Sequence, residues 1–165
     1  MTVSIRQIEE ADIDGFRNVL DLVARERRYL SFLEAPPPEA VAAFVRGNIA
    51  KGHVQLVAAS AGEVIGWCDV LPRERPIHAH CGVLGMGLLP AFRDKGHGRA
   101  LIRAAVDASW QRGMQRIELT VHASNARAIA LYQREGFARE GLFRNAIRID
   151  GRFGDVVAMA LLREA

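Results

Sequence analysis

The chain has 165 residues, half of them apolar, which is enough for one substantial core and predicts a single domain over residues 1–165. Its formal net charge of +3, without a long run of one sign, argues against nucleic acid as a partner. No stretch resembles a signal peptide or a membrane span, and the two cysteines lack CxxC spacing, so a cytoplasmic protein with no membrane partner is expected.

The first third of the chain predicts a strand followed by two helices. Residues 3–8 alternate apolar and polar positions, as a half-buried strand does. Asp12 then begins a helical pattern that continues to Ala24. The prolines at 36–38 must end that helix, because proline lacks the backbone donor, and the helical pattern resumes over residues 39–49.

Three strands are predicted in the middle of the chain. Residues 53–59 and 63–71 are β-rich and are separated by a turn at 60–62, which is typical of a hairpin. Residues 80–89 form a third strand, and three glycines interrupt it: Gly82, Gly85 and Gly87. Glycine weakens a strand, so another group is expected to approach the backbone closely there.

The remaining predicted elements alternate between helices and strands. They are a helix at 96–112, a strand at 114–122, a helix at 124–135, and strands at 138–149 and 153–162. Gly136 suits the left-handed position after a helix, which lets Phe137 fold back on Leu131 or Tyr132. Asp150-Gly151 favours a tight hairpin. The fold class is therefore α/β (α+β), a mixed sheet with helices on both faces and a parallel strand-helix-strand crossover in its middle.

The segment from Leu88 to Arg99 follows a strand directly and begins a helix. Arg93, Gly96 and Gly98 have the spacing R-x-x-G-x-G, so backbone N–H groups can face a ligand at a helix N-terminus, where phosphate is favoured. Lys95 and Arg99 add positive charge. A pyrophosphate is the expected ligand.

The alternative is a glycine turn that only connects a strand to a helix. Other phosphate-binding loops fit less well. Leu101 stands where G-x-G-x-x-G requires glycine, and no G-K-[ST] sequence follows.

Two segments resemble the GCN5-related N-acetyltransferase (GNAT) family. Residues 93–98, RDKGHG, match its coenzyme A pyrophosphate loop, and residues 117–137, IELTVHASNARAIALYQREGF, match its second conserved segment. The resemblance implies a mostly antiparallel sheet of about seven strands and acetyl-CoA as cosubstrate, with no metal. It also implies direct transfer of an acetyl group to a primary amine.

The resemblance also implies roles for residues at matching positions. The end of the 80–89 strand pairs with the pantetheine arm and splays from its neighbour at a bulge, Asn125 lies near the pantetheine, and Tyr132 lies near the thioester sulfur. The implied cofactor-binding residues are Met86, Gly87, Leu88, Leu89, Arg93, Asp94, Lys95, Gly96, His97, Gly98, Arg99, Asn125 and Tyr132.

The chemistry of amide formation requires such groups. The amine must attack as the free base, an oxyanion needs a donor such as a strand N–H near Leu88, and the departing thiolate must gain a proton. Tyr132 can supply that proton, since a phenol of pKa ~10 is only somewhat less acidic than a thiol near ~8.5. Two structural alternatives stand beside these roles: Tyr132 packing against Phe137, and Asn125 capping its helix.

The general base is left open among four side chains on strands or strand ends: Glu118, His122, Asp69 and His80. Glu118 and His122 are named as catalytic candidates. The alternative for Glu118 is a solvent-facing or ion-paired carboxylate. The alternative for His122 is a structural histidine beside Asn125.

The acceptor is expected to be a small amine such as an amino acid. Residues 141–155 resemble the C-terminal hairpin of family members that acetylate such amines, and there Arg144 and Arg148 could meet a carboxylate. The alternative is that these two charges keep an edge strand soluble. A protein N-terminus or lysine is the alternative acceptor, and a coenzyme A sensor without turnover is the alternative class. The oligomeric state is open, with a homodimer as one option. His78, His80 and Cys81 do not make a metal site, because Cys81 points to the opposite face of its strand.

Overall fold

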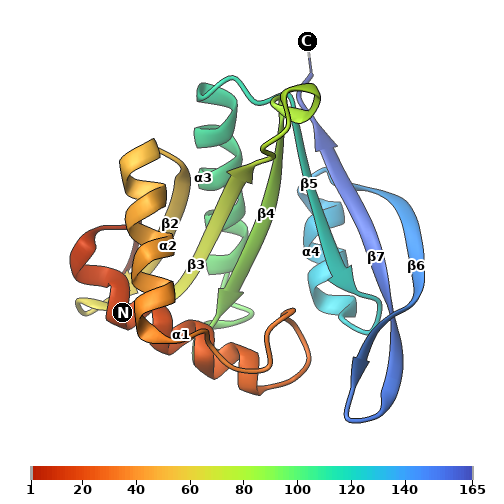
Figure 1. Cartoon of the computed structure of the whole chain (residues 1–165), viewed down its shortest axis with the longest axis horizontal. Coiled ribbons are helices and arrows are strands. Elements are labelled where there is room, and N and C mark those ends of the chain that lie inside the picture. The colour runs from red at the N-terminus through yellow and green to blue at the C-terminus, as the bar shows by residue number, and fades with distance from the viewer. Residues whose placement is uncertain (1, 165) are drawn as a thin grey trace.

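The computed structural model describes residues 2–164 and contains one mixed sheet of seven strands with helices on both faces (Figure 1). The strands are β1 (Val3–Gln7), β2 (Val54–Ser60), β3 (Glu63–Pro72), β4 (Cys81–Leu88), β5 (Arg116–His122), β6 (Ala138–Ile149) and β7 (Arg152–Leu162). The helices are α1 (Ile13–Arg25), α2 (Pro38–Lys51), α3 (His97–Gln111) and α4 (Ala126–Arg134), with 3-10 turns η1 (Glu10–Asp12), η2 (Pro76–His78) and η3 (Pro90–Phe92).

The predicted order of elements is confirmed, and each predicted boundary lies within one or two residues of the observed one. The sheet order is β1-β2-β3-β4-β5-β7-β6, and every neighbouring pair is antiparallel except β4 and β5. Among residues 2–164, no helix is both long and apolar enough to cross a membrane.

Two hydrophobic clusters hold the helices to the two faces of the sheet. On one face, α1 and α2 pack on β2 and β3, and the Phe16 ring meets Trp67 edge-on at 5.7 Å between centroids. On the other face, α3 and α4 cover a larger cluster that includes Leu101, Ile117 and Met159. Each such fully buried side chain stabilises the fold by roughly 1.5–3 kcal/mol, so the sheet is anchored from both sides.

The end of α4 has the predicted cap. Gly136 has a left-handed φ of +96°, and the Phe137 N–H donates to the Tyr132 carbonyl at 3.0 Å. The Phe137 ring then lies 5.7 Å from the Tyr132 ring, measured between centroids. This cap fixes the position of Tyr132 on the last turn of the helix.

β4 and β5 are paired only at their beginnings. Residues 81–83 of β4 pair with residues 116–118 of β5, and beyond Val83 the two strands diverge (Figure 1). The predicted splay is therefore present. The predicted bulge is not, because β4 keeps continuous register with β3 from Gly82 to Leu88. The strands separate without an extra residue, so one edge of β4 is left unpaired.

Candidate active site

The unpaired edge of β4 forms one wall of a gap in the sheet. From Leu84 to Leu88 the strand has β3 on one side and no strand on the other. Alternate backbone N–H and C=O groups of a strand point to each edge, so this edge offers free donors and acceptors to an extended ligand. The geometry suits a ligand that lies along β4 as an additional strand.

The glycines of β4 make room for side chains from neighbouring strands. A Cβ on Gly87 would lie 2.4 Å from the Trp67 ring, and one on Gly85 would lie 3.3 Å from Asp69 Oδ1. Glycine is therefore required in β4 for a reason that the sequence did not reveal. Side chains of β3 lie over the β4 backbone and reach the border of the gap.

The predicted pyrophosphate loop lies just after β4. Asp94 and Gly96 both have left-handed φ values, +60° and +86°, and Gly96 is the N-cap of α3. The N–H groups of the first turn of α3 have no acceptor within the helix. These free donors lie at the open end of the gap, where the helix dipole favours an anion.

Arg93 is held inside the protein, away from the loop surface. Its guanidinium donates to both carboxylate oxygens of Glu26, at 2.9 and 2.6 Å, and to the Leu88 carbonyl at 2.9 Å. It also lies 5.0 Å from the centre of the Tyr29 ring. The hydrogen bond with Glu26 raises the pKa of Arg93. Arg93 thus connects the end of α1 to the end of β4.

The other residues of the loop have varied surroundings. Arg99 donates to Glu135 at 2.8 Å, and Asp94 accepts from Arg127 at 3.2 Å. Lys95 is exposed, and within residues 2–164 it has no ion pair. His97, the first residue of α3, has its ring 6.4 Å from that of Phe92.

Gly98 lies at a close approach of two helices. A Cβ there would meet Leu131 Cδ2 of α4 at 3.3 Å and Met86 Cε at 3.7 Å. Leu89, at the exit of β4, donates its N–H to the Ile65 carbonyl at 3.0 Å. Both residues therefore hold the loop against the sheet.

Asn125 has the capping role that sequence reasoning gave as an alternative. Its Oδ1 accepts from the Ala128 N–H at 3.2 Å, and its own N–H donates to the His122 carbonyl at 2.9 Å. The contacts fix the turn between β5 and α4 at the open end of the gap. The side-chain nitrogen Nδ2 of Asn125 takes no part in this cap, so it is available to contact a cofactor.

Tyr132 is buried beneath the gap on the α3 and α4 face. It is 7% exposed, and burial, with a smaller effect of Cys68 of β3, raises the pKa of its phenol above the usual value. Tyr132 belongs to the same buried hydrophobic cluster as Cys68 of β3 and Leu88 of β4. Within the described residues the phenol has no hydrogen-bond partner, so no protein acceptor competes for its proton.

Glu118 and His122 lie at opposite ends of β5. Glu118 is opposite Val83 at the closed end and accepts from Arg73 at 2.5 Å and Arg116 at 2.9 Å. Burial acts to raise the pKa of Glu118, but the two arginines outweigh it and the pKa is lowered. His122 is buried at the open end, opposite Val156 of β7.

Asp69 differs from Glu118 because it has no cationic partner within residues 2–164. It is 8% exposed, and among residues 2–164 no side chain forms an ion pair or hydrogen bond with its carboxyl group. Burial raises its pKa to about 7, and the Gly85 amide acts in the opposite direction. The fourth candidate, His80, is exposed before β4, with Nε2 3.4 Å from Cys81 Sγ.

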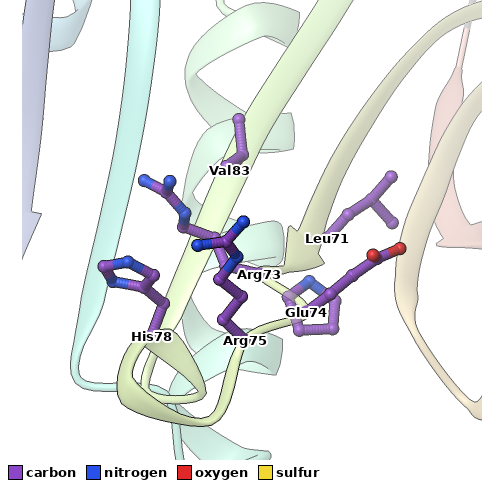
Figure 2. Close-up of a pocket in the computed structure, with 7 residues that line it drawn as sticks. Leu71, Arg73, Glu74, Arg75, His78 and Val83 are labelled. Carbon is purple, nitrogen blue, oxygen red and sulfur yellow. The ribbon is translucent and has the colours of Figure 1, made fainter.

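A basic pocket lies on the same face of the sheet as Asp69. It has a volume of about 380 Å³ and is lined by Leu71, Pro72, Arg73, Glu74, Arg75, His78 and Val83. Figure 2 shows Arg73, Arg75 and His78 around the connection between β3 and β4. The floor pair Leu71–Val83 is adjacent to the pair Asp69–Gly85 on this face, about 7 Å along the strands.

Sequence reasoning did not single out this pocket, and it named Arg144 and Arg148 as side chains that could meet a carboxylate. Arg144 is exposed on the edge strand β6, and the Arg148 guanidinium lies 5.4 Å from the centre of the Phe153 ring. The signal in the sequence was the concentration of basic residues at 73–78 between two strands. The pairing of β3 with β4 places this segment at the closed end, where β4 and β5 are still paired.

Comparison with known proteins defines the class. The model of the Acetyltransferase (GNAT) family matches residues 17–137, so the chain belongs to this family of acetyltransferases. The L-amino acid N-acetyltransferase AaaT of Escherichia coli (strain K12) is 29% identical over 163 residues, covering 98% of each protein. The N-alpha-acetyltransferase RimI of Mycobacterium tuberculosis is 35% identical over 113 residues, covering 67% of this chain and 68% of that protein.

A solved structure gives the same fold. The phosphinothricin acetyltransferase of Sinorhizobium meliloti, crystallised with acetyl-CoA, has a TM-score of 0.92 at 22% identity, covering 98% of this chain and 89% of that one. The family and fold implied by the two sequence segments are therefore confirmed.

Proposed function

We propose that residues 1–165 form one catalytic domain, an acetyl-CoA-dependent N-acetyltransferase that acetylates the primary amine of a small molecule with an anionic group, such as an amino acid. The observation that carries the proposal is the gap between β4 and β5, with a free strand edge on one side and an anion-binding helix terminus at its open end. We place the reaction in the cytoplasm, which suits the two free cysteines.

The cofactor would occupy this gap along its length. Backbone groups of Met86, Gly87, Leu88 and Leu89 would pair with the pantetheine arm, as an added strand. The amides of the first α3 turn, with Lys95 nearby, would bind the pyrophosphate. Arg93 would act by positioning the loop, since its charge is already paired with Glu26.

The gap presents the groups that amide formation needs. The amine nitrogen bonds to the thioester carbonyl carbon, the carbon–sulfur bond breaks, and the thiolate takes a proton from Tyr132. A β4 N–H near Leu88 would stabilise the oxyanion. Burial keeps the Tyr132 phenol protonated at neutral pH, but it also raises the pKa of the phenol further above that of a thiol, so transfer of this proton to the thiolate is uphill.

The basic pocket supports an anionic acceptor. Arg75 has no ion pair within residues 2–164, whereas Arg73 is shared with Glu118. An unpaired guanidinium is the group best suited to bind a carboxylate. The name of the Escherichia coli relative, an L-amino acid N-acetyltransferase, supports the same class of acceptor.

The test is a thiol-release assay with acetyl-CoA and a panel of amino acids, polyamines, aminoglycosides and peptides. Amino acids or other anionic amines are expected to react. Arg75→Ala should raise KM about tenfold for an anionic acceptor and leave KM unchanged for its amide derivative, since one charge-assisted hydrogen bond contributes roughly 1.5–3 kcal/mol. Arg139→Ala, on the exposed edge strand, is the matched control.

Two outcomes would change the assignment. Turnover of peptide N-termini alone would favour protein acetylation, the class suggested by the relative from Mycobacterium tuberculosis. Tight binding of acetyl-CoA without turnover of any amine would favour a coenzyme A sensor.

A further inference from the structure

We infer that Asp69 is the general base that deprotonates the acceptor amine, with Gln55 as its positioning residue. The inference deepens the proposed function and rests on it. Asp69 stands on β3 opposite Gly85 of β4, in the stretch where β4 has lost its partner on the other side. Because Gly85 has no side chain, the carboxylate extends over the β4 backbone, with Oδ1 3.3 Å from the place of a Cβ.

The position of Asp69 relative to the other parts of the site fits this role. It lies between the Trp67–Gly87 pair, beside the expected thioester, and the Leu71–Val83 pair at the floor of the basic pocket. An acceptor with its anionic group near Arg75 would bring its amine toward Asp69. Tyr132 lies on the opposite face, so the two proton-transfer groups are on opposite sides of the thioester.

Gln55 provides a second, independent observation. It is directly opposite Asp69 on β2, it is completely buried, and its Nε2 is the one buried side-chain nitrogen or oxygen in residues 2–164 without a hydrogen bond. Its Oε1 accepts from Asn48 at 3.0 Å, which orients the amide. Directly paired strand residues share a face and lie ~5 Å apart, so Nε2 is available to donate to an ionised Asp69.

The other candidates are less suited to accept a proton. Glu118 is neutralised by Arg73 and Arg116 at the end where β4 and β5 are still paired. His80 is exposed at that same end. His122 is at the far end of β5. A carboxyl group whose pKa is near 7 is matched to proton abstraction at neutral pH, and Asp69 is the buried acid of this face that has it.

Protons balance as follows. The acceptor ammonium gives one proton to the Asp69 carboxylate, and the free amine forms the carbon–nitrogen bond as the carbon–sulfur bond breaks. Tyr132 gives its proton to the sulfur, and the second proton of the nitrogen replaces it. Asp69 then releases its proton to solvent, so one proton is produced per acetyl group transferred.

Few other titratable side chains face Asp69, so we assign the expected pH dependence of the reaction to this carboxyl group. On its face, β4 presents glycine, and the α1 surface packed on β3 is apolar, with Glu26 paired to Arg93 at its end. The remaining titratable neighbours are Cys68, which is buried on the other face, His53 beyond Asn48, and the Arg73–Glu118 pair.

The experiment compares wild type with Asp69→Asn over a range of pH, with a reactive amine from the panel. At pH 7 the variant should lose about 10²–10³-fold in kcat. Its affinity for acetyl-CoA, measured by calorimetry, should be unchanged. The loss should shrink as pH approaches the pKa of the amine, because solution then supplies the free base. Asp107→Asn, on the exposed side of α3, is the matched control.

Gln55→Met gives a second readout. Loss of the buried donor should move the rising limb of the kcat profile to higher pH, which a purely structural defect would not do. The inference is overturned if Asp69→Asn keeps kcat within a few-fold of wild type and keeps the same rising limb of the kcat–pH profile. It is also overturned if Gln55→Met does not move that limb. In both cases the enzyme assignment stands. If wild type acetylates no amine, the proposed function fails first and this role fails with it.

Discussion

Arg93 and Asp69 show how burial gives different tasks to two charged side chains of the site. Arg93 is compensated by Glu26 on two hydrogen bonds, and a buried pair of this kind holds elements in place. Asp69 is more deeply buried than Arg93 and has no cation, so burial acts on its proton affinity. Arg93 has a partner of opposite charge and Asp69 has none, and this decides the different roles of the two residues.

At the same scale, Tyr132→Phe tests the proposed general acid. The variant should lose about 10²-fold or more in kcat, because the proton for the thiolate is removed. Its stability should change by less than about 1 kcal/mol, since the phenol makes no hydrogen bond within the described residues. Steady-state kinetics and urea unfolding measure the two effects.

Tyr29→Phe is the control for this prediction, because the ring that lies against Arg93 is retained. Unchanged kcat in Tyr132→Phe would show that solvent protonates the sulfur. A fall in acetyl-CoA affinity of the same size as the fall in kcat would instead assign the hydroxyl to binding.

The elements around the gap are held by their ends. α3 begins at Gly96 in a left-handed conformation and reaches α4 at Gly98, while α4 begins at the Asn125 cap and ends at Gly136. β4 is held along its whole length by β3, and its opposite edge is free beyond Val83. A free strand edge between fixed helices is a preformed site, which needs little rearrangement to accept an extended ligand.

Gly96→Val tests the loop at the scale of the α3 terminus. Gly96 has φ +86° and open space around its Cα, so the side chain should cost about 1–2 kcal/mol through backbone strain alone. The same strain should turn the N–H groups of the first turn away from the pyrophosphate. Acetyl-CoA affinity, measured by calorimetry, is expected to fall at least tenfold.

Gly113→Val is a matched control at the other end of α3, because Gly113 also has φ +86° and open surroundings. It should lose similar stability and keep its acetyl-CoA affinity. Equal affinity in both variants would contradict the proposed loop.

In the whole molecule, the gap divides the sheet into two parts that are joined at both ends. At the closed end, three residue pairs of β4 and β5 are reinforced by Glu118, which accepts from Arg73 on one side and Arg116 on the other. Near the other end, Arg27, just after α1, donates to Asp150 in the β6–β7 turn at 2.7 and 3.1 Å. The strand pairs hold the closed end, whereas the Arg27–Asp150 ion pair is exposed and contributes at most about 1 kcal/mol at the other end.

Stability of the whole molecule should depend on pH through Asp69. Between pH 4 and 7 the folded chain keeps a proton on Asp69 that the unfolded chain loses, so the folded state binds more protons and its stability falls as pH rises. A shift from 3.8 to about 7 corresponds to roughly 4 kcal/mol.

Urea unfolding of wild type and Asp69→Asn measures this effect. The stability of the variant relative to wild type should increase from pH 4 to pH 7 and stay constant above that. Taking the difference cancels the carboxylates with lowered pKa, such as Asp12 and Glu135, whose effects occur at lower pH and have the opposite sign. A constant difference over the whole range would show that Asp69 is not a buried acid of raised pKa.

Local sequence signals predicted the elements and the family. The Asp150-Gly151 turn has φ of +52° and +76° as its composition required, and the segments 93–98 and 117–137 identified the family. Contacts between distant residues were not predicted. Arg93 and Glu26 are 67 positions apart, and Arg73 and Glu118 are 45 apart. Neither pairing has a local signature.

The sequence by itself determined the order of helices and strands, the loop that begins α3 and the family, because each depends on periodicity and turn chemistry over a few residues. Only the tertiary structure decided which of the two candidate carboxylates, Glu118 or Asp69, lacks a cation, where the basic pocket lies and which side chains lie over the β4 glycines. These depend on strand register and on the face to which each side chain points, and both are set when β2, β3, β4 and β5 come together.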